Sequence, residues 1–415
     1  MTLNPNLIHV AVIGSGLAGA ACAAGLQRAG TQVTVFEKAQ TVGGRAATQH
    51  AGLIGVSGAE HSVTFDTDAQ CFTPIRPRFN AVLARAMSAD GSREWRSRVH
   101  TVWPVEAGRC LVATPTILTM CHQLLAGAAV HPNRVVRRLQ RAPDGSWYLA
   151  AEGMPLAGPF HHVVLAIPPA QAAVLMAGHQ DNWADALVAR RMEPCWSLMA
   201  VTDDVDWQWD AAKPARGPLA WVLRNDRLPG RTSPPGLAVW TARATAEWSA
   251  AHLDDDPQTV SDKLQSALRA QLPTTSGSSS IRWHHTNVHR WRYAEPAVNY
   301  DDGFDSSECW WDESLGLGIC GDFLGDGGIE AAWHSGDELA DCMAASFERT
   351  EVLDCDGVAP DTPARSIPSI NPSVIDPSAA VCQASRRLVP PLHSGANQFA
   401  GAGKKVSRRV SVINR

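Results

Sequence analysis

Three glycines near the start of the chain have the spacing of a phosphate-binding turn. Gly14, Gly16 and Gly19 follow a β-branched run, Val10 to Ile13, and an alanine-rich segment from Leu17 to Arg28 comes next. In this pattern the first glycine allows a tight turn, the second lets backbone approach a pyrophosphate, and the third lets helix and strand pack closely. The free N–H groups and positive dipole at the start of the helix attract phosphate. The spacing therefore predicts a dinucleotide site.

An acidic residue completes this unit. A second strand is predicted over Gln32 to Phe36, and it ends on Glu37. An acid about 20 residues beyond the glycine turn accepts hydrogen bonds from ribose hydroxyls. It favours the unphosphorylated ribose of FAD or NAD over that of NADP. The predicted contacts of the adenosine half are Gly14, Ser15, Gly16, Leu17, Ala18, Gly19, Glu37 and Lys38.

A second glycine pair lies just beyond the second strand, at Gly43-Gly44-Arg45. Glycines there permit a close approach to the other side of the pyrophosphate, and an arginine gives bidentate contacts to it. A Rossmann domain for nicotinamide alone does not need this arginine, so the predicted cofactor is FAD. The string GSGLAG…VFEKAQTVGGRAAT resembles the N-terminus of flavin-containing amine oxidases and their relatives, including renalases. The resemblance implies that FAD is tightly held.

A remote stretch, Leu315 to Ala344, has the pattern of a buried strand, a glycine turn and a long helix. The same resemblance implies that Asp322 hydrogen-bonds the ribityl chain and that Gly321 lets backbone approach the second phosphate. The helix is predicted to begin near Ile329 and Glu330 and to direct its N-terminus toward the pyrimidine end of the flavin. A dipole placed there stabilises the anionic reduced flavin by about 0.3–1 kcal/mol or more. The resemblance also places Val135 against the adenine, although an ordinary strand explains that residue equally well.

The composition of the 415-residue chain limits the classes of protein. Chains beyond about 250–300 residues usually divide into more than one core. A net charge of -5 gives no general attraction to nucleic acid or anionic lipid. Ten cysteines without a C-x-x-C pair indicate neither a zinc site nor a disulfide framework, and no metal is predicted. No apolar run approaches the length of a membrane span and no signal peptide is apparent, so we expect a cytoplasmic protein.

The middle of the chain differs from its two ends. Strand-like runs alternate with Pro/Gly turns from residue 195 to 299, and one amphipathic helix is predicted over Pro257 to Leu272. The predicted fold class is α/β, a Rossmann-type FAD domain of the two-dinucleotide-binding kind with an inserted mixed or antiparallel sheet. The predicted parts are an FAD domain of residues 1–75, 115–190 and 285–350, a substrate domain of residues 76–114 and 191–284, and a disordered tail of residues 351–415.

Two stretches of this middle region, PLAWVLRNDRLPGR and VHRWRYAEP, resemble bacterial renalase-like sequences. Arginine beside aromatic residues suits an anionic aromatic ligand such as a dihydronicotinamide dinucleotide. A strand with a solvated basic edge explains the stretches about as well. Tryptophans of this region could also cage a planar or cationic substrate, or only pack the core. The candidate substrate-pocket residues are Gln70, Trp221, Arg224, His289 and Arg292.

One departure from the resembled family falls between Asp66 and Gln70. Asp68 stands where renalase-like sequences have glycine. A carboxylate there could hinder the substrate or the flavin, and a solvated turn is the equally good alternative.

The reaction is predicted from what the flavin supplies and from the motifs that the sequence lacks. No nucleophile–base pair and no redox dithiol motif stand out, and no second G-x-G-x-x-G follows a strand as in NAD(P)H-using reductases. We therefore expect a substrate that gives hydride directly to the flavin. The first hypothesis is a renalase-like oxidase of isomeric dihydronicotinamide nucleotides with O2 as acceptor. The second is a flavin amine oxidase acting on a small amine, and the third is a flavin-binding protein with impaired turnover.

Overall fold

The computed structural model describes residues 7–54, 60–68, 70–88, 92–95, 99–101, 110–272, 281–297 and 307–355. The chain divides into two compact units, Met1–Arg365 and Ser366–Arg415, and all described residues belong to the first. The predicted tail lies outside the described residues, apart from the end of helix α8 (Gly328–Cys355). No helix within the described ranges is long and apolar enough to cross a membrane.

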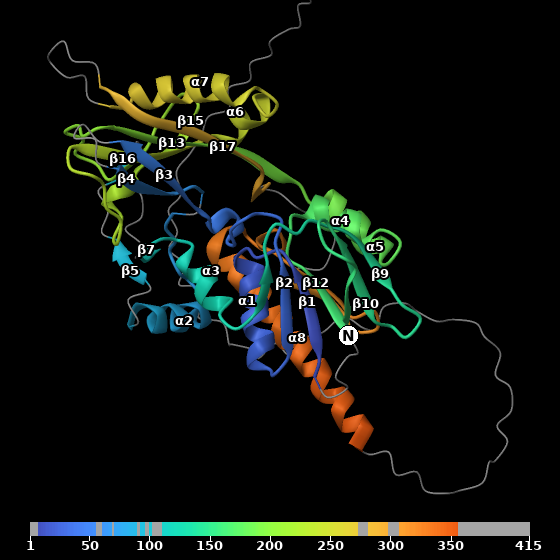
Figure 1. Cartoon of the computed structure of the whole chain (residues 1–415). Coiled ribbons are helices and arrows are strands. Elements are labelled where there is room, and N and C mark those ends of the chain that lie inside the picture. Colours follow the sequence, from blue (N-terminus) through green and yellow to red (C-terminus); the bar gives the residue numbers. More distant parts are fainter. Residues whose placement is uncertain are drawn as a thin grey trace, which may run out of the picture. The chain divides into compact units, whose positions relative to one another are not determined.

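A six-stranded sheet holds the two glycine-rich units (Figure 1). Five of its strands run parallel, and the edge strand β18 is antiparallel to β19. In spatial order the strands are β18 (Cys309–Asp312), β19 (Leu317–Cys320), β12 (His162–Leu165), β1 (His9–Ile13), β2 (Gln32–Phe36) and β8 (Ala129–His131). This parallel sheet confirms the predicted α/β class.

Helix α1 (Leu17–Arg28) connects β1 and β2, so the predicted βαβ unit is confirmed. Strand β1 lies between β2 and β12 and is buried on both faces, as its continuous apolar run predicts. Helix α8 packs along α1, backbone against backbone (Figure 1). A Cβ added to Gly336 of α8 would lie 2.0 Å from the Ala18 carbonyl oxygen, so only glycine permits this approach.

The second six-stranded sheet supplies the surface opposite the glycine-rich turns. Its order is β17 (Trp283–Pro296), β13 (Met192–Asp203), β16 (Leu237–Ala244), β15 (Leu219–Arg224), β14 (Ala211–Lys213) and β6 (Val99–Thr101). All pairs are antiparallel except β14 with β6. Helices α6 (Ala246–Ala251) and α7 (Pro257–Arg269) cover one face, and the hairpin of β3 (Thr48–Ile54) and β4 (Glu60–Asp66) lies on the other (Figure 1).

One predicted domain boundary differs from the structure. The predicted domain boundary at residue 285 falls inside β17, which pairs with β13 along its length and so belongs to the second sheet as far as Pro296. The remaining elements are α2 (Pro77–Ser88), β5 (Ser92–Trp95), β7 (Cys110–Ala113), α3 (Thr119–Leu124), β9 (Val136–Arg141), β10 (Trp147–Ala151), β11 (Ala157–Phe160), α4 (Pro169–Met176), α5 (Asp181–Ala189) and the single turns η1 (Gly44–Ala46), η2 (Asn225–Arg227) and η3 (Asp322–Leu324).

The ring of His162 connects the first sheet to α8 and gives a pH-dependent prediction. It stacks on Phe347 with ring centroids 4.9 Å apart and meets the edge of Trp311. Burial, and then the neighbouring His161, lower the pKa of His162 to about 4. This pKa lies below the value of about 6.5 in the unfolded chain. The contribution of the neutral His162 ring to folding stability is therefore fully present above about pH 6.5 and decreases as the pH falls toward 4. We expect His162→Phe to flatten this dependence.

The measurement is the melting temperature of wild type and variant at steps from pH 4.5 to 7.5. Since all other titrating groups are shared, the difference between the two curves isolates His162. Parallel curves would contradict the assignment.

Candidate cofactor and substrate site

The first glycine turn forms an open, uncapped helix start. Gly14 has a φ of +103°, and a Cβ there would lie 2.3 Å from the Ala166 carbonyl oxygen. Gly16 is the N-cap of α1 and provides no side-chain cap, and the atom nearest to a Cβ on it would be 4.0 Å away. Leu17 and Ala18, in the first turn, are each 7% exposed. A sheltered helix start without a side-chain cap fits a phosphate.

Glu37 lies beside this turn at the end of β2 and is 5% exposed. Its Oε2 accepts hydrogen bonds from the Ser15 backbone nitrogen at 3.0 Å and the Ser15 hydroxyl at 2.6 Å. Its Oε1 accepts one from Ala39 N at 2.8 Å. Glu37 therefore holds the glycine turn in place, a role that the sequence did not predict. Oε1 keeps acceptor capacity for a ribose hydroxyl, which is the predicted role.

Two other predicted adenosine contacts follow from the same strand end. Arg134 N donates to the Glu37 carbonyl oxygen at 2.7 Å, and this contact places the half-buried Val135 next to the end of β2. Lys38 is exposed and close enough to His289 to lower the pKa of that ring, after the larger effect of burial. Both residues lie near the end of β2, and their contacts with a nucleotide stay predictions.

The second glycine pair packs against the first turn. Gly43 N donates to the Ser15 carbonyl oxygen at 3.0 Å, and a Cβ on Gly44 would lie 3.4 Å from Gly16 Cα. The Arg45 guanidinium bonds the Asp322 carboxylate through both Nη atoms, with Nη1 at 2.7 Å from Oδ2. Arg45 and Asp322 were predicted to contact different parts of the cofactor, and they bond to each other. The two glycine-rich units, remote in sequence, therefore meet at one place.

The start of α8 is tied to other parts of the chain. The Glu330 carboxylate accepts hydrogen bonds from Ile75 N at 2.9 Å and Arg76 N at 2.6 Å, so it anchors the segment that leads into α2. Ile329 packs half-buried against the main core. Gly321 N donates to the Ser335 hydroxyl at 2.8 Å, a contact that the sequence did not predict. The Gly321 N–H is therefore already bonded within the chain.

Four side chains form a row across the second sheet, on the face away from α6 and α7. Ser197 of β13 pairs with His289 of β17 and with Arg243 of β16, and Arg243 pairs with Trp221 of β15. Directly paired residues of neighbouring strands point to the same face. Two predicted pocket residues, Trp221 and His289, therefore share this row with two residues that the sequence analysis missed.

Gln70 joins the row from the chain segment after β4. Its Oε1 accepts a hydrogen bond from Trp221 Nε1 at 3.0 Å, and its Nε2 donates to Thr241 Oγ1 at 2.8 Å. Gln70 is 4% exposed, and its amide is thus held in a defined orientation. The structure brings Gln70, Trp221 and His289 to one surface, although they are far apart in sequence.

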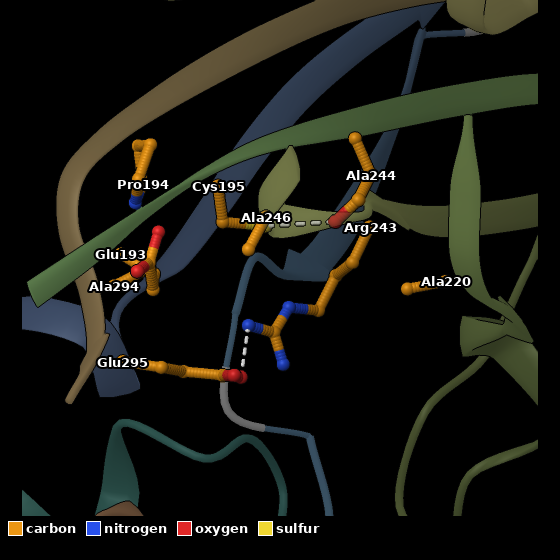
Figure 2. Close-up of a pocket in the computed structure, with 9 residues that line it drawn as sticks. All are labelled: Glu193, Pro194, Cys195, Ala220, Arg243, Ala244, Ala246, Ala294 and Glu295. Carbon is orange, nitrogen blue, oxygen red and sulfur yellow. Dashed lines mark hydrogen bonds and ion pairs between the residues drawn. The ribbon is translucent and has the colours of Figure 1, made fainter. Parts of the chain in front are cut away.

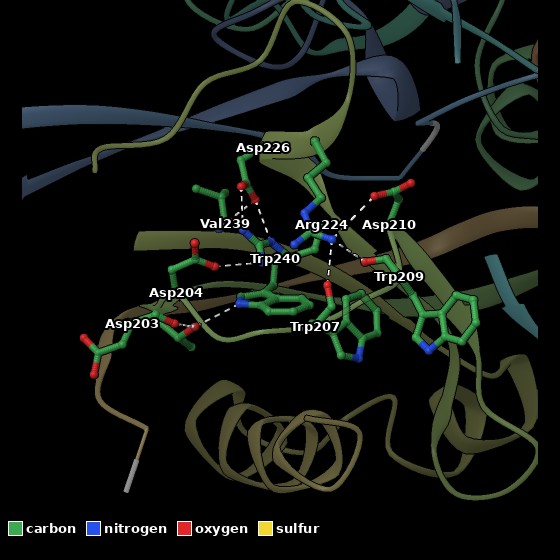
Figure 3. A network of polar contacts seen from close by, with 11 residues as sticks. Asp203, Asp204, Trp207, Trp209, Asp210, Arg224, Asp226, Val239 and Trp240 are labelled. Carbon is green, nitrogen blue, oxygen red and sulfur yellow. Dashed lines mark hydrogen bonds and ion pairs between the residues drawn. The ribbon is translucent and has the colours of Figure 1, made fainter. Parts of the chain in front are cut away.

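Arg224 and Arg292, also predicted for the pocket, lie on the opposite face of the sheet. Arg224 is three residues from Trp221 on one strand, so it points the other way. Its guanidinium lies 4.9 Å from the Trp240 ring centroid and pairs with Asp226 at 2.7 Å (Figure 3). Arg292 lies next to Trp291 and pairs with Asp254 at 2.8 Å. The structure does not bring these two arginines to the row.

A small cavity of about 90 Å³ opens beside the row (Figure 2). Arg243 pairs across it with Glu295 at 2.6 Å, and Arg243 Nε lies 2.9 Å from Asp68 Oδ1. Burial raises the pKa of the Asp68 carboxyl, and Arg243 opposes this shift. The cavity is lined by Glu193, Pro194, Cys195, Ala220, Arg243, Ala244, Ala246, Ala294 and Glu295.

Several buried polar atoms at this surface have no hydrogen-bond partner. They are Ser197 Oγ, Trp291 Nε1, Asp68 Oδ1 and Arg243 Nε; the last two are close but poorly aligned for a hydrogen bond. Cys195, which lines the cavity, pairs with Trp291 across β13 and β17. Because buried polar atoms are nearly always bonded, this group fits a polar ligand. No three His, Cys, Asp or Glu side chains of the described residues could hold a metal ion.

Comparison with known proteins agrees with the glycine-rich turns at the start of the chain. Residues 12–86 match the family described as NAD(P)-binding Rossmann-like domain. The chain begins with a Rossmann-type dinucleotide-binding unit. A curated relative is the tRNA 5-methylaminomethyl-2-thiouridine biosynthesis bifunctional protein MnmC of Magnetococcus marinus. It is 25% identical over an alignment of 289 residues that covers 53% of this chain. The match spans 43% of that relative's length.

Solved structures show the wider fold. A candidate protoporphyrinogen oxidase from Exiguobacterium sp. 255-15 has a TM-score of 0.60 at 11% identity, covering 81% of this chain and 99% of its own. Putrescine oxidase bound to putrescine has a TM-score of 0.56 at 12% identity, covering 82% of this chain and 99% of its own. At such identities the likeness establishes the fold, which is that of flavin amine and protoporphyrinogen oxidases.

Proposed function

We propose that the chain is an FAD-dependent oxidoreductase in which a small substrate gives hydride to the flavin and O2 accepts the electrons. The uncapped start of α1 would hold the pyrophosphate, and Glu37 would hold the adenosine ribose. Arg45 and Asp322 would hold the remainder of the cofactor, since they bring the two glycine-rich units together. When bound, flavin supplies the hydride acceptor and the reaction with oxygen.

The observation that best supports this proposal is that the cavity beside the second sheet lies next to the Arg45–Asp322 ion pair, where the two glycine-rich units meet. Arg45 Nη1 donates to the Ala294 carbonyl oxygen at 2.6 Å, and Ala294 and Glu295 line the cavity. A substrate held there would lie next to the predicted cofactor site. The buried row would orient it and exclude water, as hydride transfer requires.

The charge around the cavity favours a small amine as the substrate. Three acids, Asp68, Glu193 and Glu295, lie near Arg243, and the nearby Arg45 interacts most strongly with a fourth acid, Asp322. This excess of acid suits an ammonium group. The sequence hypothesis of impaired turnover loses support, because Arg243 compensates the added carboxylate of Asp68.

Renalase-like oxidation of dihydronicotinamide isomers is the second candidate. The aromatic side chains of Trp221 and Trp291 and the half-buried ring of His289 suit a flat ring. Two of the arginines predicted to bind the phosphates of such a substrate, Arg224 and Arg292, lie on the helix-covered face and are paired with acids there. This is why we place the amine first.

Reduction of the protein-bound flavin in the absence of oxygen tests the proposal. The purified protein is expected to be yellow, and a panel of small primary and secondary amines is expected to bleach it. Bleaching by dihydronicotinamide isomers alone would support the second candidate, and bleaching by dithionite alone would support a binding protein without turnover. Protein without flavin that also fails to bind added FAD would overturn the proposal.

A pair of tryptophan variants shows whether the row holds the substrate. Trp221→Phe removes the hydrogen bond to Gln70, and a misplaced substrate costs up to about 10²-fold in rate. Trp248→Phe is the matched control, because Trp248 packs on the helix-covered side of the same sheet. Equal rates of flavin reduction in both variants would exclude the row from substrate binding.

A further inference from the structure

Two cysteines face each other at the edge of the substrate site. Cys71 directly follows Gln70, and Cys110 is the first residue of β7. Between them, Phe72 and Leu111 exchange both backbone hydrogen bonds, Phe72 N to Leu111 O at 3.0 Å and Leu111 N to Phe72 O at 2.8 Å. Residues that flank such a pair on either strand point to one side. Cys71 and Cys110 are therefore diagonal neighbours on one face.

The surroundings make the two thiols unequal. Both are free, half-buried and within hydrogen-bonding reach of each other. The hydrogen bond from Cys71 lowers the pKa of Cys110, whereas the same bond and burial raise the pKa of Cys71. Both side chains, and that of Trp221, pack against the buried cluster that contains Trp95 and Leu223. Cys110 thus ionises first, with Cys71 adjacent to it.

Two other thiol pairs provide a comparison, one fully buried and one with a half-buried member, Cys342. Cys22 is within hydrogen-bonding reach of Cys320, and Cys309 of Cys342. Those hydrogen bonds and burial raise the pKa of both Cys22 and Cys309. Cys22 and Cys320 are 0% exposed. Buried, protonated thiols react slowly, so the fully buried pair Cys22–Cys320 is the internal control for Cys71 and Cys110.

We propose that Cys71 and Cys110 are a peroxide-reactive thiol pair that closes to a disulfide beside the substrate site. The Cys110 thiolate attacks one oxygen of hydrogen peroxide, the O–O bond breaks, and water leaves after protonation, giving a sulfenic acid. Cys71 then attacks that sulfur, the S–S bond forms, and a second water leaves. Two thiols are oxidised, and one peroxide is reduced to two waters.

A disulfide between Cys71 and Cys110 would act on Gln70 in the substrate site. Gln70, next to Cys71 in the chain, holds the Trp221 indole by a 3.0 Å hydrogen bond. A disulfide would fix this segment to β7 and thereby connect the redox state of the pair to the position of Gln70. The oxidase chemistry proposed above would release peroxide close by, but the site itself is testable with added peroxide, whatever the protein's own reaction.

Peptide mapping of the whole protein tests the pair directly. The protein is treated with equimolar hydrogen peroxide, blocked with a maleimide and digested without reduction. We expect a linked peptide that contains Cys71 and Cys110, two hydrogens lighter than the sum of the free peptides and separated by dithiothreitol. The buried Cys22, Cys309 and Cys320 are expected to be labelled only after denaturation. Maleimide on both Cys71 and Cys110 after peroxide treatment would overturn the proposal.

Two serine variants test the separate roles. In Cys71→Ser the sulfenic acid at Cys110 cannot close and is expected to be trapped by dimedone. In Cys110→Ser we expect Cys71 to stay unmodified. Equally rapid reaction of Cys71 in that variant would overturn the assigned roles. The wild-type mapping needs no variant, so the proposal stays testable if a variant folds poorly.

Discussion

Arg231→Met is expected to destabilise the protein by about 3–5 kcal/mol, because it leaves a buried carboxylate without its partner. Arg231 and Asp66 are each 1% exposed at the side chain, and Arg231 Nε donates to Asp66 Oδ2 at 3.0 Å. The other carboxylate oxygen accepts hydrogen bonds from Thr48 Oγ1 at 3.0 Å and Ile117 N at 3.2 Å. The pair thus joins β4, the start of α3 and the loop after β15.

Urea unfolding of wild type and variant measures this loss. Arg137→Met is the matched control, since the Arg137–Glu152 pair has side-chain exposures of 67% and 54% and exposed pairs contribute about 0–1 kcal/mol. Replacing both partners, as in Asp66→Leu with Arg231→Met, is expected to recover part of the loss, because no unpaired charge then remains. Equal losses for Arg231→Met and Arg137→Met would contradict this account.

Gly16→Val is expected to weaken FAD binding by at least about 100-fold, or about 2.7 kcal/mol, while leaving the apoprotein folded. Gly16 has a φ of -66°, which valine adopts readily, and the nearest atom to its Cβ would be 4.0 Å away. The fold therefore has room for the side chain. The predicted phosphate position does not, because the side chain would occupy the space in front of the α1 N–H groups.

The measurement is the flavin content of the purified variant and the Kd for added FAD. Gly52→Val is the matched control, because Gly52 is exposed in β3, outside the glycine turns, with no atom within 4 Å of its Cβ. Melting temperatures of the two apoproteins are expected to agree within about 4 °C. Normal FAD binding by Gly16→Val would remove the first turn from the cofactor site.

The secondary structure at the start of the chain follows from the sequence alone. Strand β1, helix α1 and strand β2 were predicted at or within one residue of their bounds, since apolar periodicity and glycine turns are local signals. Helix α7 was predicted from its apolar spacing, and it ends at Arg269 rather than Leu272. The opposite placements of Trp221 and Arg224 were also within reach of the sequence, because the alternation along a strand separates residues three apart.

Other features needed the tertiary structure. Arg243 carries no motif, and Glu295 lies in the stretch VHRWRYAEP without a predicted role. Only the pairing of β13, β15, β16 and β17 brings them to the cavity. The bond between Arg45 and Asp322, 277 positions apart, likewise depends on how the two glycine-rich units meet. Strand register arises from contacts between distant segments, and a one-residue shift would turn each side chain to the other face.

The sequence by itself determined that this protein has a Rossmann-type dinucleotide-binding unit and a second glycine-rich unit near residue 321, because turn geometry and helix starts depend on neighbouring residues. The tertiary structure alone decided which side chains share the substrate surface. That surface is built from β-strand partners far apart in the chain, whose register brings Arg243 next to Glu295, and from the segment after β4, which brings Asp68 to Arg243.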